Sequence, residues 1–192
     1  MNILEVPSSI KNKLVCPYDL GLIVADIMKR YSHDPKTQTG AAIIDDRYNI
    51  YGIGSNCYPF AKTLTEKDKQ LLNSNNFDNI HRFRLEHAER NAVAFGVRNG
   101  NPLKDTIMTV SYTPCVNCAN TIANSGIIEV VDGSVPDFTH HRWGSDWEYV
   151  VKQLFPACGL KYSHYQVNPK TKDKVLFSLE NLIDKYYYQN TR

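Results

Sequence analysis

The 192-residue sequence contains no apolar run that approaches the roughly 20 residues needed by a membrane-spanning helix. Its first residues also lack the basic start, apolar centre and small-residue cleavage site of a secretory signal peptide. Both absences argue against a membrane-embedded or secreted protein. We therefore expect a cytoplasmic protein with no membrane partner.

An excess of charge of one sign is missing too, because 22 Lys and Arg residues nearly balance 20 Asp and Glu residues, for a net charge of +2. Nucleic-acid polymers are usually bound by a strongly basic patch, so they are not the expected partner. Repeats and low-complexity segments are absent, and the length suits one hydrophobic core. We expect a single domain over 1–192, in which 161–192 forms a C-terminal extension.

Cysteine is sparse, with five residues in the chain, and an odd number cannot pair completely into disulfides. Two of them, Cys115 and Cys118, form a CxxC directly after Pro114. In a reducing compartment this spacing favours metal binding over a disulfide.

The periodicity of apolar residues predicts alternating strands and helices. We expect helices at 18–31, 65–73, 87–98, 115–124, 147–155 and 175–188, and strands at 41–45, 50–54, 106–112, 127–131 and 162–167. Such alternation is typical of an α/β protein. The predicted architecture is a three-layer α/β/α sandwich around a central mixed five-stranded sheet.

His87 and the two cysteines are the strongest chemical signal in the sequence. One imidazole and two thiolates suit Zn²⁺, and three protein ligands leave the fourth tetrahedral position to water, as in catalytic zinc sites. Cys115 and Cys118 begin a predicted helix and point to one side, where the helix dipole favours thiolates. We predict that His87, Cys115 and Cys118 bind catalytic zinc.

Glu89 lies two residues after His87, so its side chain cannot share the direction of the imidazole. We expect its carboxylate to reach the water that zinc activates and to act as the general acid and base. HxE followed by PCxxC is also the known signature of zinc deaminases.

Several segments resemble the cytidine and deoxycytidylate deaminase superfamily, and within it the deoxycytidylate (dCMP) deaminases of bacterial and phage type. HAERNA at 87–92 matches the family motif, DPKTQTGA at 34–41 resembles DPSTQVGA, GIGSNCYP at 52–59 resembles GTGYNGFP, and SGI at 125–127 resembles AGI. PDF at 136–138 and RWG at 142–144 look like a segment of one branch. The resemblance covers roughly 18–160 and implies a cytidine deaminase-like fold.

The resemblance implies hydrolysis of dCMP to dUMP and ammonia in pyrimidine nucleotide metabolism. It assigns Asn56 to the sugar of the nucleotide monophosphate and the backbone around Ala88 to the carbonyl of the base. It also implies a homo-oligomer, with a hexamer as one form, and dCTP and dTTP as candidate effectors. Ser55 and Cys57 depart from the family loop, where tyrosine and glycine stand, and this puts the effector control in doubt.

Other interpretations remain open from the sequence. The chain could deaminate another cytosine nucleotide, tRNA or single-stranded nucleic acid, or be a catalytically silent zinc-binding regulatory subunit on the same fold. Arg82, Arg84 and Arg142 are candidates for the 5′-phosphate. Cys16, Cys57 and Cys158 could join His33 or His81 in a second, structural zinc site, although no spacing supports one.

Overall fold

A computed structural model describes residues 2–59, 64–74, 85–134 and 148–190. Its sheet has six strands in the order β1-β3-β2-β4-β5-β6. These are β1 (Leu4–Glu5), β2 (Gly40–Ile44), β3 (Asn49–Ser55), β4 (Ile107–Val110), β5 (Glu129–Asp132) and β6 (Lys161–His164). β4, β5 and β6 run parallel, whereas the other pairs are antiparallel, so the sheet is mixed as predicted.

The prediction of five strands is wrong by one, because β1 pairs with β3 at the edge of the sheet. A strand of two residues is too short to show the alternation by which strands are recognised in a sequence. The other five strands lie where the pattern placed them, within a few residues.

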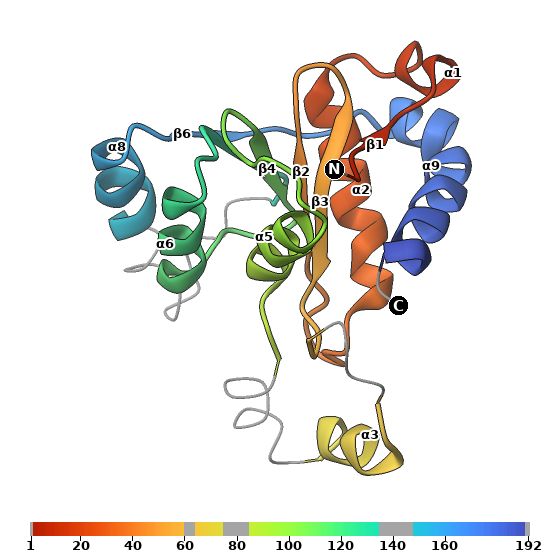
Figure 1. Cartoon of the computed structure of the whole chain (residues 1–192), viewed down its shortest axis with the longest axis vertical. Helices are drawn as coiled ribbons and strands as arrows, with labels where there is room; N and C mark the ends of the chain where they lie inside the picture. Colours follow the sequence, from red (N-terminus) through yellow and green to blue (C-terminus); the bar gives the residue numbers. More distant parts are fainter. Residues whose placement is uncertain (1, 60–63, 75–84, 135–147, 191–192) are drawn as a thin grey trace.

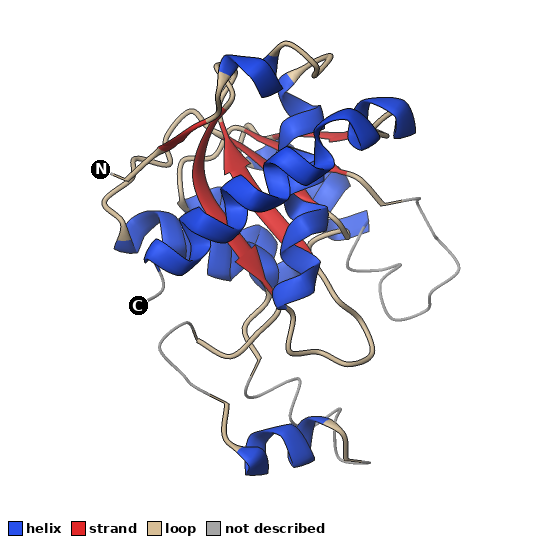
Figure 2. Cartoon of the chain, turned by 90° about the vertical axis from the view of Figure 1, so that its right-hand side faces the viewer, coloured by secondary structure: helices blue, strands red, loops and turns tan. Residues whose placement is uncertain are grey.

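Helices cover both faces of the sheet, which confirms the three layers (Figure 1). On one face lie α1 (Ser8–Lys11), α2 (Pro17–Met28) with the short 3₁₀ turn Lys29–Tyr31, and α9 (Pro169–Asn190). On the other lie α5 (Ala88–Arg98), α6 (Val116–Asn124), the π-helical turn Val150–Leu154 and α8 (Phe155–Ala157). Figure 2 shows the helices that cover the first face in front of the strands.

The C-terminal helix differs most from its prediction. α9 begins at Pro169 rather than at residue 175, since proline is well tolerated in the first turn of a helix. The helix predicted at 147–155 is present as a continuous helical run over 148–157, which is π-helical at Val150–Leu154 and ends in α8; the first predicted residue lies outside the described residues.

α3 (Glu66–Leu72) lies apart from the three layers, beyond one end of the sheet (Figure 1). Leu72 packs with Tyr58 and Leu85 in a small cluster of its own. Within the described ranges, no helix is both long enough and apolar enough to span a membrane.

Candidate metal centre and active site

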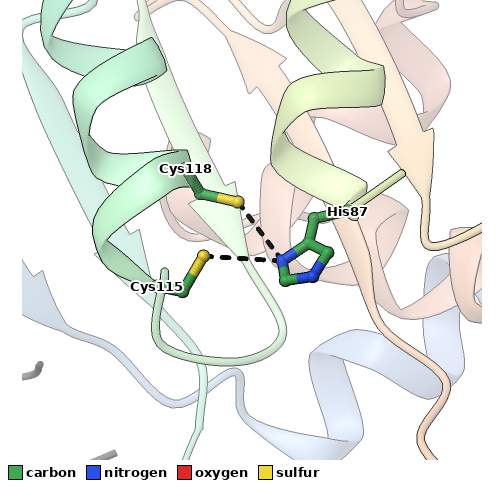
Figure 3. Close-up of side chains that lie close together, drawn as sticks. All are labelled: His87, Cys115 and Cys118. Atoms are coloured by element: carbon green, nitrogen blue, oxygen red, sulfur yellow. Dashed lines mark hydrogen bonds between the residues drawn. The ribbon is translucent and has the colours of Figure 1, made fainter. Parts of the chain in front are cut away.

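The three predicted ligands come together where two helices begin. His87 is the N-cap residue of α5, Cys115 is the N-cap residue of α6, and Cys118 lies in the first turn of α6. The Nδ1 atom of His87 is 3.6 Å from Sγ of Cys115 and 3.4 Å from Sγ of Cys118 (Figure 3). The free amides and positive dipole ends of both helices therefore favour thiolates at this point.

These distances fit a zinc ion. Nitrogen and sulfur ligands at about 2.0 and 2.3 Å from a tetrahedral zinc lie roughly 3.6 Å from each other. In the described part of the chain, this is the one group of three or more His, Cys, Asp or Glu side chains whose ligand atoms all lie within 4.8 Å of one another. The donor set, one imidazole and two sulfurs, suits zinc and leaves the fourth position without a protein ligand from these residues.

Hydrogen bonds within the cluster set its protonation. Donation from the Cys118 thiol, together with donation from His87, lowers the pKa of Cys115 to about 3 against the effect of burial. The same bond to Cys115, together with burial, raises the pKa of Cys118. The bond to Cys115 also raises the pKa of His87. The opposite shifts favour the thiolate at Cys115, and a metal ion that binds both sulfurs displaces their remaining thiol protons.

Glu89, in the first turn of α5, is buried beside these ligands and only 7% exposed. Burial raises the pKa of its carboxyl group, although the neighbouring His87 ring favours the charged form. The Cys118 side chain also favours the charged form of the Glu89 carboxyl, as the smallest of these effects. A buried carboxyl with a raised pKa beside a metal centre is suited to accept and return protons near neutral pH.

The segment before His87 is held by main-chain hydrogen bonds to the residues that follow β3. Cys57 and Glu86 exchange both of their bonds, at 3.1 and 2.8 Å, in an isolated bridge. The buried amide of Asn91 donates to the carbonyl of Ser55 at 2.8 Å and lies 3.4 Å from the carbonyl of Glu86. This network fixes the start of α5 and thereby the direction of His87.

The side chain of Asn56 is hydrogen-bonded to other residues of the protein. Its carbonyl oxygen accepts bonds from the Ser32 hydroxyl and the Thr39 amide, both at 2.7 Å. Its amide donates to the carbonyl of Thr37 at 2.7 Å and to Asp34 at 3.3 Å. Asn56 therefore shapes the loop between α2 and β2. Ala88 is 1% exposed, at the start of α5.

Among the other suggested residues, those that the structure describes do not form a second metal-binding group. Arg82, Arg84, His81 and Arg142 lie outside the described residues. Cys57 is buried at 2% exposure and lies against the Asn91 amide, while the His33 ring accepts the backbone N–H of Tyr58. The candidate metal-binding group found in the described residues contains none of the side chains suggested for a second zinc site.

A cleft of about 180 Å³ lies at the other face of the sheet, between α2, α9 and the segment after β6. Its charged residues are engaged with one another, because Lys29 and Lys172 both contact Asp26. The cleft is lined by neither zinc ligands nor Glu89 and supplies no group suited to deamination.

Comparison with known proteins places this geometry in context. The family model of the cytidine and deoxycytidylate deaminase zinc-binding region matches residues 21–134 of this chain. The human deoxycytidylate deaminase is 32% identical over 75% of this chain and 76% of its own length. The probable deoxycytidylate deaminase of Drosophila melanogaster is 28% identical over 86% of this chain and 80% of its own.

Solved structures show the same fold. The dCMP deaminase of the cyanophage S-TIM5, crystallised in complex with dCMP and dUMP, superposes with a TM-score of 0.55 at 17% identity. The match covers 84% of this chain and 100% of the cyanophage chain. The similarity therefore includes the sandwich as a whole.

Proposed function

Because the chain belongs to the cytidine and deoxycytidylate deaminase zinc-binding family, we propose that it is a zinc-dependent hydrolase that converts dCMP to dUMP and ammonia. One observation carries the proposal: the buried carboxyl of Glu89 lies directly beside His87, Cys115 and Cys118. A structural zinc site has no use for such an acid. This favours catalysis over a silent regulatory subunit.

His87, Cys115 and Cys118 would hold the zinc, which when bound supplies the Lewis-acid activation of water for hydrolysis. Glu89 moves the protons of the reaction. It accepts one proton from the attacking water and delivers it to N3 of the pyrimidine, and then takes the second proton from the hydroxyl added at C4 and delivers it to the departing amino group. Water adds at C4 and ammonia leaves, so the products are dUMP and ammonia.

The remaining site residues hold the substrate. We assign the backbone around Ala88 to the carbonyl of the base. Asn56 contacts the sugar by exchanging one internal hydrogen bond for a sugar hydroxyl, and its 3.3 Å bond to Asp34 is the longest of the four. A substrate that is a nucleotide monophosphate agrees with the human and insect relatives, whose names specify deoxycytidylate.

A substrate panel tests the function. Zinc-loaded protein is assayed for ammonia release from dCMP, CMP, dCTP and a short single-stranded oligonucleotide, with chelator-treated protein as the control. We expect dCMP to have the highest kcat/KM and the chelator to abolish turnover. Activity on the oligonucleotide alone would overturn the assignment, and the near-neutral charge of the chain speaks against that outcome.

We further propose a cytoplasmic homo-oligomer, with a hexamer as the form to test first and dCTP and dTTP as its candidate effectors. A reducing compartment keeps the two ligand cysteines available to the metal. Light scattering on the purified chain gives the number of subunits, and dCMP saturation curves with each triphosphate reveal any change in apparent affinity.

A further inference from the structure

Asp132, the last residue of β5, is fully buried and lies near the cysteine ligands. One of its carboxylate oxygens accepts bonds from the hydroxyls of Thr113 and Tyr162, both at 2.6 Å. The other accepts the backbone N–H of Ser134 at 2.7 Å. A distance of 2.6 Å is typical of a hydroxyl that donates to an ionised carboxylate, the stronger class of hydrogen bond.

Thr113 belongs to the turn that carries Cys115, one of the proposed zinc ligands. This turn connects β4 to α6, and Thr113 lies two residues before Cys115, separated from it by the buried Pro114. The start of the same turn is held by Ser111, whose hydroxyl and amide both bond to Gly40, at 2.9 and 3.0 Å. Asp132 provides the second attachment, next to the sulfur ligands.

Tyr162 connects this attachment to the C-terminal part of the chain. It lies on β6, whereas the family match ends at residue 134. Its ring stacks on the fully buried Phe155, with centroids 6.0 Å apart and planes at 29°. A ring packed in this way presents its hydroxyl to Asp132 in one direction.

We infer that Asp132 is a positioning residue for the zinc ligands, and that Tyr162 fixes it so that the Thr113 hydroxyl holds the Cys115 turn in place. The inference rests on the proposed zinc site but not on the identity of the substrate. Partners that orient metal ligands commonly change metal affinity by 10- to 100-fold when they are removed.

The test compares the rate at which zinc is released to an excess of chelator, at a temperature well below unfolding and without substrate. Thr113→Val removes the hydroxyl and keeps the shape, so we expect release to be about tenfold faster. Thr113→Ser restores the donor and should release zinc within about threefold of the parent rate. Thr121→Val removes a hydroxyl that donates only to the carbonyl of Asn117 within α6 at 3.2 Å; it is the matched control and should leave the rate unchanged.

Tyr162 is tested by a double-mutant cycle. Tyr162→Phe should accelerate release several-fold in the parent protein and have no further effect in the Thr113→Val background, because Tyr162 acts on the turn only through Asp132. Tyr51→Phe removes a hydroxyl that donates to Asp45 at 3.0 Å, at the opposite end of the sheet, and serves as its control. If the two substitutions acted only through a general loss of stability, their effects on the rate of zinc release would instead multiply in the double variant.

Two results would overturn the inference: unchanged zinc release in Thr113→Val, or effects of Thr113→Val and Tyr162→Phe that multiply. Thiol reactivity of Cys115 in chelator-treated protein gives a second readout, which we expect to rise in Thr113→Val and not in Thr121→Val. Because neither readout involves dCMP, failure of the proposed deamination would leave the result interpretable.

Discussion

Two glutamates near the start of α5 have opposite surroundings. The side chain of Glu86 is 39% exposed and forms an ion pair with Arg90, and it also accepts the backbone N–H of His87 at 3.0 Å. Glu89 is buried, and burial raises the pKa of its carboxyl group. The exposed acid therefore helps to begin the helix, whereas the buried acid is the one that we propose to exchange protons with the substrate.

Glu89→Gln keeps the shape of the side chain and removes its ability to carry a proton. We expect one zinc per chain, as in the parent, and a kcat lower by about 10²- to 10⁴-fold. Glu148→Gln, on the exposed surface, is the matched control. Zinc content is measured by atomic absorption and turnover by ammonia release, and turnover at the parent rate would show that Glu89 is not the proton carrier.

The cluster of His87, Cys115 and Cys118 could be predicted at the residue scale because these residue types are rare and their spacings are short. Cys115 and Cys118 lie on one turn of a helix, and Glu89 lies two residues from His87. Asp132 could not be predicted in this way, because its partners Thr113 and Tyr162 lie 19 and 30 residues away. Such contacts depend on the order of strands in the sheet, which a single sequence does not specify.

At the scale of elements, the close approach of α5 to β3 fixes the position of His87, the proposed zinc ligand at the start of α5. Gly54 makes this approach possible, because a Cβ atom there would lie 2.2 Å from the carbonyl oxygen of Ala88 and 2.4 Å from the amide of Ala92. Both are backbone atoms of the helix, so the helix itself would have to move.

We therefore expect Gly54→Ala to destabilise the protein by about 1–3 kcal/mol or more and to accelerate zinc release. Gly96→Ala, within α5, is the control, since its new Cβ would first meet the movable side chain of Leu103 and alanine is the better helix former. Thermal unfolding and zinc release to a chelator measure both effects. Equal stability of the two variants would show that α5 can shift without cost.

Asp26 links α2 to α9 through Lys172 and also pairs with Lys29 at 2.9 Å. Burial alone would raise its pKa, but the bonds to Lys172 and Lys29 together outweigh it and lower the pKa. A lowered pKa means that the contribution to stability is present above the unfolded-state pKa and is lost as pH falls through the folded-state value.

We expect Asp26→Asn to lower the melting temperature at pH 7 and to have progressively less effect below about pH 4. The loss at pH 7 should stay near or below about 1 kcal/mol, because the side chain is 37% exposed and solvent screens the pairs. Unfolding of chelator-treated protein is followed across this pH range. Glu66→Gln, whose partner Lys69 lies on the same short helix, is the control. A constant difference at all pH values would contradict the ion-pair origin.

Most elements could be predicted from their periodicity, and the exceptions have physical reasons. β1 and α1 span two and four residues, too few to show a period. The first turn of α9 reads as Pro-Lys-Thr-Lys, which carries no apolar repeat, yet its Thr171 is buried by the tertiary fold. Periodicity reports burial of apolar side chains, so elements that are short or begin with polar residues escape it.

For the whole molecule, the C-terminal segment completes the sandwich. Val175, Leu179, Ile183 and Tyr186 of α9 lie in the same core cluster as residues of α2 and the sheet, and β6 adds the outermost parallel strand. The packing supports our proposal of one domain over 1–192 and argues against a detachable extension at 161–192. A single domain should unfold in one cooperative transition.

Leu179 and Phe177 lie two positions apart on α9, and substitutions at them test whether the chain unfolds as a single domain. Leu179 is fully buried, whereas Phe177 is 76% exposed. We expect Leu179→Ala to cost about 2–5 kcal/mol and to lower the melting temperature by roughly 4–20 °C, while Phe177→Ala stays within about 0.5 kcal/mol of the parent. If α9 belongs to the same cooperative unit as the metal centre, helix loss by circular dichroism and zinc release to a fluorescent indicator shift together in Leu179→Ala. Two separate transitions, with zinc retained after α9 has unfolded, would instead show that 161–192 folds independently. Only a segment that is not coupled to the metal centre can lose its core contacts and leave the zinc ligands in place.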